Sequence, residues 1–149
     1  MPQFHFRLAT LQRLRESDRD ERRGQLAEAQ RAEQIVIERI AAIDNEIEQL
    51  RTQCVEATRP GKVDVDLLME SQRFELILKL ERQTAEQQRQ LVAAEVQKRR
   101  DALVAVDREV RVLEKLRDTQ LERHRQDEEK RDMQQLDEIA GRGFWRKEE

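Results

Sequence analysis

The amino-acid sequence predicts an all-α protein, in which two long helices form an antiparallel coiled-coil hairpin. Three observations predict this fold: 41% of the 149 residues are charged and 3% aromatic, apolar residues follow a heptad spacing in both halves, and a Pro-Gly turn separates the halves. A globular domain of this length needs a thicker apolar core to offset the chain entropy lost on folding. The regular spacing argues against disorder, so a thin seam between two helices is the remaining arrangement.

The first half has apolar residues three and four positions apart, which is the spacing of a coiled-coil seam. We expect the first helix to run from about Pro2 to Ala57. The expected seam residues are Leu26, Ala29, Val36, Ile40, Ile43, Ile47, Leu50 and Cys54. The stretch from Arg15 to Gln25 has no apolar residue and contains Gly24. A glycine there costs about 1 kcal/mol relative to alanine, so this section is predicted to be weak.

A turn signal follows the first helix. Pro60 lacks a donor amide and Gly61 tolerates a positive φ, so the helix ends and the chain turns over residues 58 to 66. Asp64 or Asp66 then accepts hydrogen bonds from free amides and starts the second helix.

The second helix is expected from about Asp66 to Ala140, followed by a flexible tail from 141 to 149, with residues 1–149 forming a single domain. The expected seam residues are Leu67, Ser71, Phe74, Leu78, Ala85 and Val92, then Val96, Leu103, Val106, Val110 and Leu113. The step from Val92 to Val96 adds a second consecutive spacing of four, which predicts a stutter in the supercoil. Because this helix is the longer one, about twenty of its residues should extend past the first helix.

Catalytic and metal-binding patterns are missing from the sequence, so we expect no enzyme activity, no cofactor and no metal. His5 and His124 are interpreted as surface residues, and Cys54 as a small seam residue rather than a reactive thiol. The net charge of -3 is mixed along the chain, which argues against nucleic acid. The absence of an apolar stretch of about 20 residues predicts a soluble, cytoplasmic protein without stable membrane insertion.

Four short segments carry a family resemblance that spans nearly the whole chain. They are Phe4-His5-Phe6-Arg7-Leu8 with Leu11, Leu14 and Arg15, then Leu26-Ala27-Glu28-Ala29-Gln30, Val112-Leu113-Glu114-Lys115-Leu116-Arg117, and Leu136-Asp137-Glu138-Ile139-Ala140. With these segments the chain resembles the flagellar export protein FliJ family of bacterial type III export. The opening phenylalanines and the closing segment count most, because a heptad pattern does not require them.

The resemblance implies a soluble component of the flagellar export apparatus, cytoplasmic and peripheral to the inner membrane. Family members look like the central stalk of rotary ATPases. Their paired terminal helices enter the hexameric flagellar export ATPase, promote its activity and link it to the cytoplasmic domain of the export gate. They also bind export chaperones.

Two sets of site residues follow from the resemblance. The predicted ATPase-binding residues are Phe4, Phe6, Leu8, Leu11, Arg15, Leu136, Asp137, Glu138 and Ile139; the alternative for the apolar members is closure of the open end of the hairpin. The predicted export-gate-binding residues are Phe74, Leu76, Ile77 and Leu80; the alternative is seam packing, with some apolar side chains left over. Two other functions remain open: a general coiled-coil scaffold or tether, and the equivalent stalk of a virulence-type secretion system.

Overall fold

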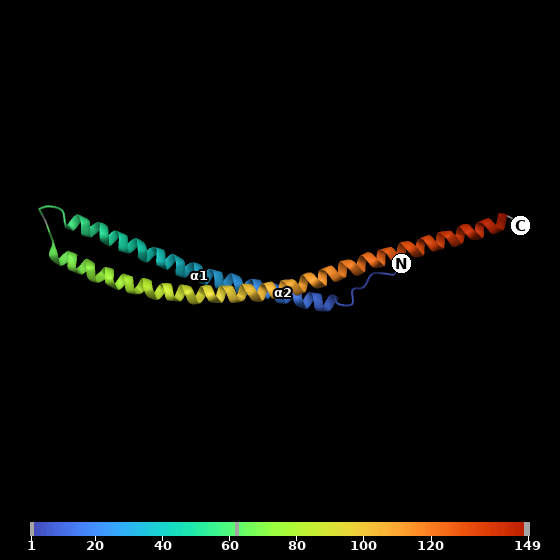
Figure 1. The fold of residues 1–149 in the computed structure, drawn as a ribbon, viewed down its shortest axis with the longest axis horizontal. Helices are drawn as coiled ribbons and strands as arrows, with labels where there is room; N and C mark the ends of the chain where they lie inside the picture. The colour runs from blue at the N-terminus through green and yellow to red at the C-terminus, as the bar shows by residue number, and fades with distance from the viewer. Residues whose placement is uncertain (1, 62, 148–149) are drawn as a thin grey trace. The chain divides into compact units, whose positions relative to one another are not determined.

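The computed structural model describes residues 2–61 and 63–147, which form the helices α1 (Ala9–Ala57) and α2 (Val65–Lys147) (Figure 1). The two helices pack against each other as a hairpin, which confirms the predicted all-α fold. The chain divides into two compact units. The hairpin unit is Glu21–Leu103, and the terminal unit combines the residues up to Asp20 with those from Val104 onward. The single domain expected for residues 1–149 stays a prediction.

The seam of α1 in the hairpin unit follows the predicted spacing. All eight expected residues, from Leu26 to Cys54, are buried or half-buried. Ile43 and Ile47 form a buried cluster with Leu78 of α2, and Leu50 packs against this cluster. The burial of these aliphatic side chains between the two helices therefore stabilises this unit.

The seam of α2 differs from the prediction at two positions near the loop. Leu68 and Glu75 are half-buried, whereas Leu67 and Phe74, which were expected there, are exposed. A shift of one residue rotates a helical position by about 100°. Phe74 was assigned to the seam because it is apolar, but the structure places the stem of a glutamate there.

The predicted stutter at Val92 to Val96 is wrong. The seam of α2 in the hairpin unit consists of two rows with seven-residue spacing: Leu68, Glu75, Arg82, Arg89, Val96 and Leu103 form one, and Ser71, Leu78, Ala85, Val92 and Arg99 form the other. All of these residues except the exposed Arg89 are buried or half-buried. The spacing of four and three is therefore unbroken. In the first row, Arg89 is followed by the apolar Val96, but the seven-residue spacing does not change there.

Ion pairs between the helices involve two polar members of the seam, Glu75 and Arg82. Arg82 Nε lies 2.6 Å from Asp44 Oδ1, and Arg51 Nε lies 3.2 Å from Glu75 Oε1. Asp44 and Arg51 are one heptad apart on α1, as are Glu75 and Arg82 on α2, which is the geometry of an antiparallel pair. The hydrogen bonds from Arg51 and Lys79 lower the pKa of Glu75, and the hydrogen bond to Asp44 raises the pKa of Arg82. These exposed pairs specify register more than stability.

The loop has the predicted turn chemistry. Gly61 adopts a φ of 111°, the left-handed region that favours glycine. The Thr58 amide donates to the Cys54 carbonyl at 3.2 Å and continues the last turn of α1. The Leu67 amide donates to Asp64 Oδ1 at 3.2 Å, so Asp64 is the N-cap of α2.

In the terminal unit, α1 begins at Ala9 and not at the predicted Pro2. The residues before it run along α2, and the Phe4 ring lies 5.6 Å from the His124 ring, centroid to centroid. Phe4 and Phe6 are both half-buried. Two residues in alternate positions share a side in an extended segment but are about 200° apart in a helix. Burial of both rings therefore favours the extended conformation.

The middle of the α1–α2 contact in the terminal unit is polar on the α1 side. Arg15 Nε lies 3.1 Å from Glu109 Oε2, and Arg19 Nη1 lies 3.9 Å from Asp107 Oδ1. Val110 is nevertheless fully buried. We infer that the aliphatic stems of the arginines cover the valines of α2 while their charged ends reach acidic partners.

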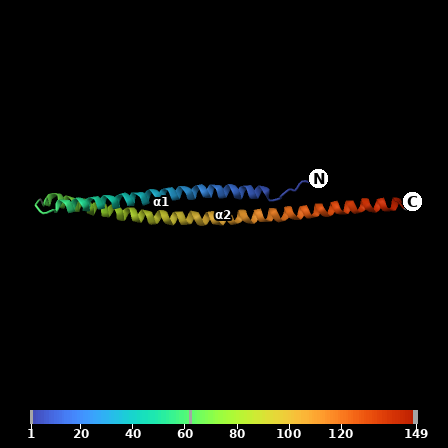
Figure 2. The same ribbon diagram turned by 90° about the horizontal axis from the view of Figure 1, so that it is seen from above.

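The end of α2 extends further than predicted. The helix continues through Gly141 and Gly143 to Lys147, so the expected tail is helical where it is described. A positive φ at a glycine often ends a helix. Among the described glycines, Gly61 has a positive φ, and Gly141 and Gly143 do not. Every residue from Glu129 to Lys147 is exposed, which confirms that α2 extends past its partner (Figure 2).

Candidate functional site

The side chains with metal-binding or reactive chemistry include His5, His124 and Cys54. In the part of the chain that the structure describes, no group of three His, Cys, Asp or Glu residues is placed to hold a metal ion. His124 Nε2 lies 3.2 Å from Glu128 Oε1, four residues along the same helix, and the Cys54 thiol is half-buried on the seam. Neither residue belongs to a metal-binding group in this part of the chain.

The predicted ATPase-binding residues all lie in the terminal unit, but they form two groups. The first group consists of Phe4, Phe6, Leu8, Leu11 and Arg15, at the start of the chain and on the first turns of α1. The second group consists of Leu136, Asp137, Glu138 and Ile139, all exposed on the overhang of α2. Phe4 lies beside His124, and Leu136 is about three helical turns further along α2. A partner that binds both groups would have to extend along this length of α2.

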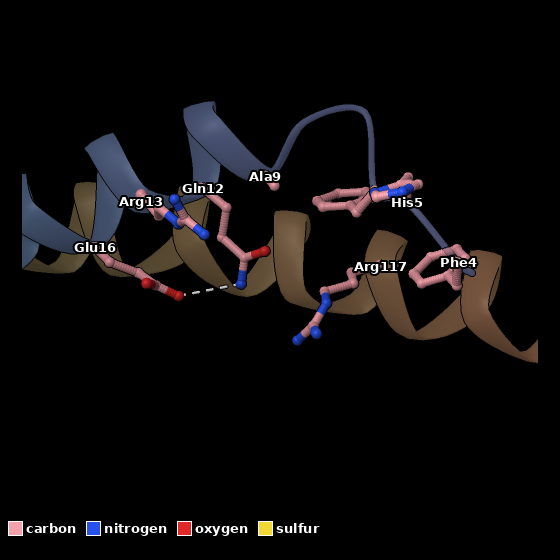
Figure 3. A pocket seen from close by; sticks show the side chains of 8 residues that line it. Phe4, His5, Ala9, Gln12, Arg13, Glu16 and Arg117 are labelled. Carbon is pink, nitrogen blue, oxygen red and sulfur yellow. Dashed lines mark hydrogen bonds between the residues drawn. The ribbon is translucent and has the colours of Figure 1, made fainter.

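Two members of the first group, Phe4 and Phe6, line a hollow of about 380 Å³ between the start of the chain and α2 (Figure 3). Phe4, His5, Phe6 and Arg117 line it together with Ala9, Gln12, Arg13 and Glu16. The Gln12 side-chain amide donates to Glu16 Oε1 at 3.1 Å along one wall. The half-buried rings of Phe4 and Phe6 contribute to closing the open end of the hairpin, and Leu8 and Leu11 remain exposed.

Sequence reasoning missed the α2 side of this site. Arg117 and His124 continue the seven-residue row of Leu103 and Val110, so the heptad count would have placed them opposite the start of the chain. They were overlooked because neither is apolar. At His124 the ring of Phe4, which precedes α1, lies against this row.

The predicted export-gate-binding residues Phe74, Leu76, Ile77 and Leu80 are all exposed, and all lie in the hairpin unit. Val65, Leu67 and Met69, one to three turns earlier on α2, are exposed as well. The first turns of α2 are therefore apolar on sides that α1 does not cover. The arrangement is typical of a helix segment that another protein covers, because large exposed apolar patches are uncommon on isolated proteins.

Comparison with known proteins identifies one family. No curated protein and no solved structure gives a significant match. The model of the Flagellar FliJ protein family matches residues 4–149, nearly the whole chain, and this family is a non-catalytic part of the flagellar export apparatus. In the described residues, no helix is long and apolar enough to cross a membrane. The chain therefore belongs to the flagellar FliJ protein family and is a component of the flagellar export apparatus.

Proposed function

We propose that this protein acts as a central-stalk-like component that binds the hexameric export ATPase through its terminal unit and promotes ATPase activity. The same protein couples the ATPase to the cytoplasmic domain of the export gate through the hairpin unit, and it escorts export chaperones. It works in the cytoplasm, peripheral to the inner membrane. The family supports a role in export, and the exposed apolar residues support this choice of binding surfaces.

The observation that carries the proposal is the exposure of Leu136 and Ile139 on the overhang of α2. Both side chains lie beyond the last half-buried residue of α2, Glu128, so the hairpin itself does not cover them. Burying an aliphatic side chain contributes about 1.5–3 kcal/mol. A partner that encloses both gains several kcal/mol, and the neighbouring carboxylates of Asp137 and Glu138 set the orientation of binding.

Replacing Leu136 and Ile139 with Asp is expected to abolish stimulation of the cognate ATPase. The variant loses the apolar burial and places two charges in the contact, so binding should weaken at least about a hundredfold, which corresponds to about 2.8 kcal/mol. The measurement is the ATP hydrolysis rate of the purified ring as a function of the concentration of this protein.

The matched control replaces Leu91 and Val112 with Asp. These residues are the same kinds of side chain on the same helix and are at least as exposed, so the cost to the helix is similar. The control should stimulate the ATPase as the unchanged protein does. Equal stimulation by both variants, or no stimulation by the unchanged protein, would exclude the proposed role.

The gate surface makes a separate prediction. Replacing Phe74 and Ile77 with Ala is expected to weaken binding to the cytoplasmic domain of the export gate by about ten- to a hundredfold, because truncation of apolar anchors at an interface costs about 1–3 kcal/mol. ATPase stimulation should not change. Titration calorimetry with the isolated gate domain measures the affinity.

The control for the gate surface replaces Ile35 and Val55 with Ala. Both are exposed aliphatic residues of α1 in the same unit. Their replacement should leave gate binding intact. If the Phe74/Ile77 variant and the Ile35/Val55 variant lose affinity for the gate domain equally, the gate does not bind at Phe74 and Ile77.

A further inference from the structure

The last two turns of α2 carry a cationic and aromatic surface that the proposed stalk role does not use. Arg142, Gly143, Trp145 and Arg146 surround an open hollow together with Ile139. Trp145 is the most exposed of the aromatic side chains, together with its largely exposed neighbour Phe144. Among residues 2–61 and 63–147, none forms an ion pair or a side-chain hydrogen bond with Arg142 or Arg146, whereas Arg51, Arg82 and Arg99 are all paired.

The spacing of the two arginines brings their charges together. Residues four apart lie on the same face of a helix, with their Cβ atoms about 5–6 Å from each other, and like charges at this spacing destabilise the helix. Gly143 between them carries no side chain, and a Cβ there would meet no atom within 4 Å beyond its chain neighbours and the nearby backbone of its own helix. The face therefore presents two neighbouring guanidinium groups over open space, with Trp145 at the edge.

The helix dipole explains only part of this pattern. Basic residues in the last turn complement the partial negative charge of a helix C-terminus, and Arg146 and Lys147 occupy that turn. Lysine serves this purpose as well as arginine, and the effect needs no aromatic residue. The exposed Trp145 and the second guanidinium of Arg142 are left unexplained, and tryptophan and arginine are the residues most enriched where proteins bind each other.

The chemistry favours a carboxylate-bearing protein segment over a membrane surface. A guanidinium binds a carboxylate through two parallel hydrogen bonds, and two adjacent arginines bind two carboxylates or one shared group. Recognition of anionic lipid by charge uses clusters of about 4–8 basic residues. Here there are three, Arg142, Arg146 and Lys147, and the acidic Asp137 and Glu138 precede them by about one turn.

We propose that the last two turns of α2 form a docking surface for an acidic segment of a protein partner. Arg142 and Arg146 bind carboxylates of that segment, and Trp145 packs against an apolar side chain beside them. The hollow shares Ile139 with the predicted ATPase-binding residues, but Arg142, Trp145 and Arg146 are outside both predicted sets. The proposed ionic contacts therefore do not require the ATPase or gate contacts.

Trp145 provides the readout, because the chain has one tryptophan and no tyrosine. The full chain is titrated with a synthetic peptide rich in glutamate and phenylalanine while tryptophan emission is recorded. We expect a saturable change in emission that weakens as salt is added, since the contact is ionic. The R142Q/R146Q variant should bind at least tenfold more weakly, and an R108Q/R125Q variant, with two exposed arginines changed elsewhere on α2, should bind as the unchanged protein does.

Each of the following results would overturn the proposal. The first is an equal response to a peptide with glutamine in place of glutamate, which would mean that the carboxylates are not recognised. The second is a response to vesicles of phosphatidylcholine and phosphatidylglycerol without a response to the peptide, which would indicate a membrane surface instead. The third is unchanged peptide affinity in R142Q/R146Q, or no emission change with any probe.

Discussion

Replacing Leu78 with Ala is expected to lower the free energy of unfolding by about 2–4 kcal/mol. Leu78 is 3% exposed and belongs to the cluster with Ile43 and Ile47. Removal of its side chain leaves a cavity in a seam that is only two helices thick, and few neighbouring side chains are available to fill it. The effect is large because the described core is small, so Leu78 contributes a large share of its buried apolar surface.

Leu80 provides the matched control. It is 57% exposed and lies two residues further along α2, so Leu80→Ala changes the same atoms on the same helix without opening a cavity. Its replacement should change the free energy of unfolding by less than about 0.5 kcal/mol. Urea unfolding followed by circular dichroism at 222 nm measures both variants. Equal losses at the two positions would mean that the seam does not run along Leu78.

Replacing Val110 with Asp is expected to separate the helices of the terminal unit. Val110 is fully buried, and an unpaired charge at that position costs several kcal/mol. Arg15 and Arg19 form ion pairs on the α1 side of this contact, and pairs of this kind contribute too little to offset the cost. We expect the amides from Ala9 to Asp20 to lose at least about a hundredfold of their protection from hydrogen exchange.

Val112→Asp is the control for this substitution. Val112 is 66% exposed and lies two residues away on α2, so the new carboxylate remains in water. Hydrogen exchange resolved by residue, measured by nuclear magnetic resonance, should show unchanged protection in α1. Loss of protection in the Val112 variant, or full protection in the Val110 variant, would contradict the packing in the terminal unit.

The seam of α1 was predictable from the sequence because its residues are almost all aliphatic. The seam of α2 was predicted only in part, because Glu75 and Arg82 occupy seam positions through ion pairs with residues far along the chain. Apolar spacing alone cannot identify a charged residue whose partner is on another helix. The predicted stutter arose in this way, since skipping polar positions changes the apparent spacing.

The ends of the helices were harder to predict. The start of α1 depends on Phe4 reaching His124, a contact between residues far apart in the sequence. The end of α2 depends on whether Gly141 and Gly143 adopt a positive φ, which their residue type permits but does not require. Local patterns identify where a helix is able to end, and tertiary contacts decide whether it does.

The candidate surfaces were predicted from a family resemblance, and the structure adds their exposure and grouping. It places Phe74 outside the seam and in solvent, where the spacing of apolar residues had put it inside. It also divides the predicted ATPase-binding residues into a group at the start of the chain and a group on the overhang. Phe4, Phe6 and Arg15 of the first group are half-buried, whereas every member of the second group, which includes Leu136, is exposed.

Site-specific photo-cross-linking tests most directly whether the overhang of α2 contacts the ATPase. A benzophenone amino acid replaces Leu136 in one sample and Val112, which is similarly exposed on the same helix, in another. Each is irradiated with the assembled ring under conditions in which this protein stimulates ATP hydrolysis. If the overhang contacts the ATPase, irradiation gives an adduct with the ATPase from position 136 and none from position 112. Stimulated hydrolysis without an adduct from position 136 would contradict this contact.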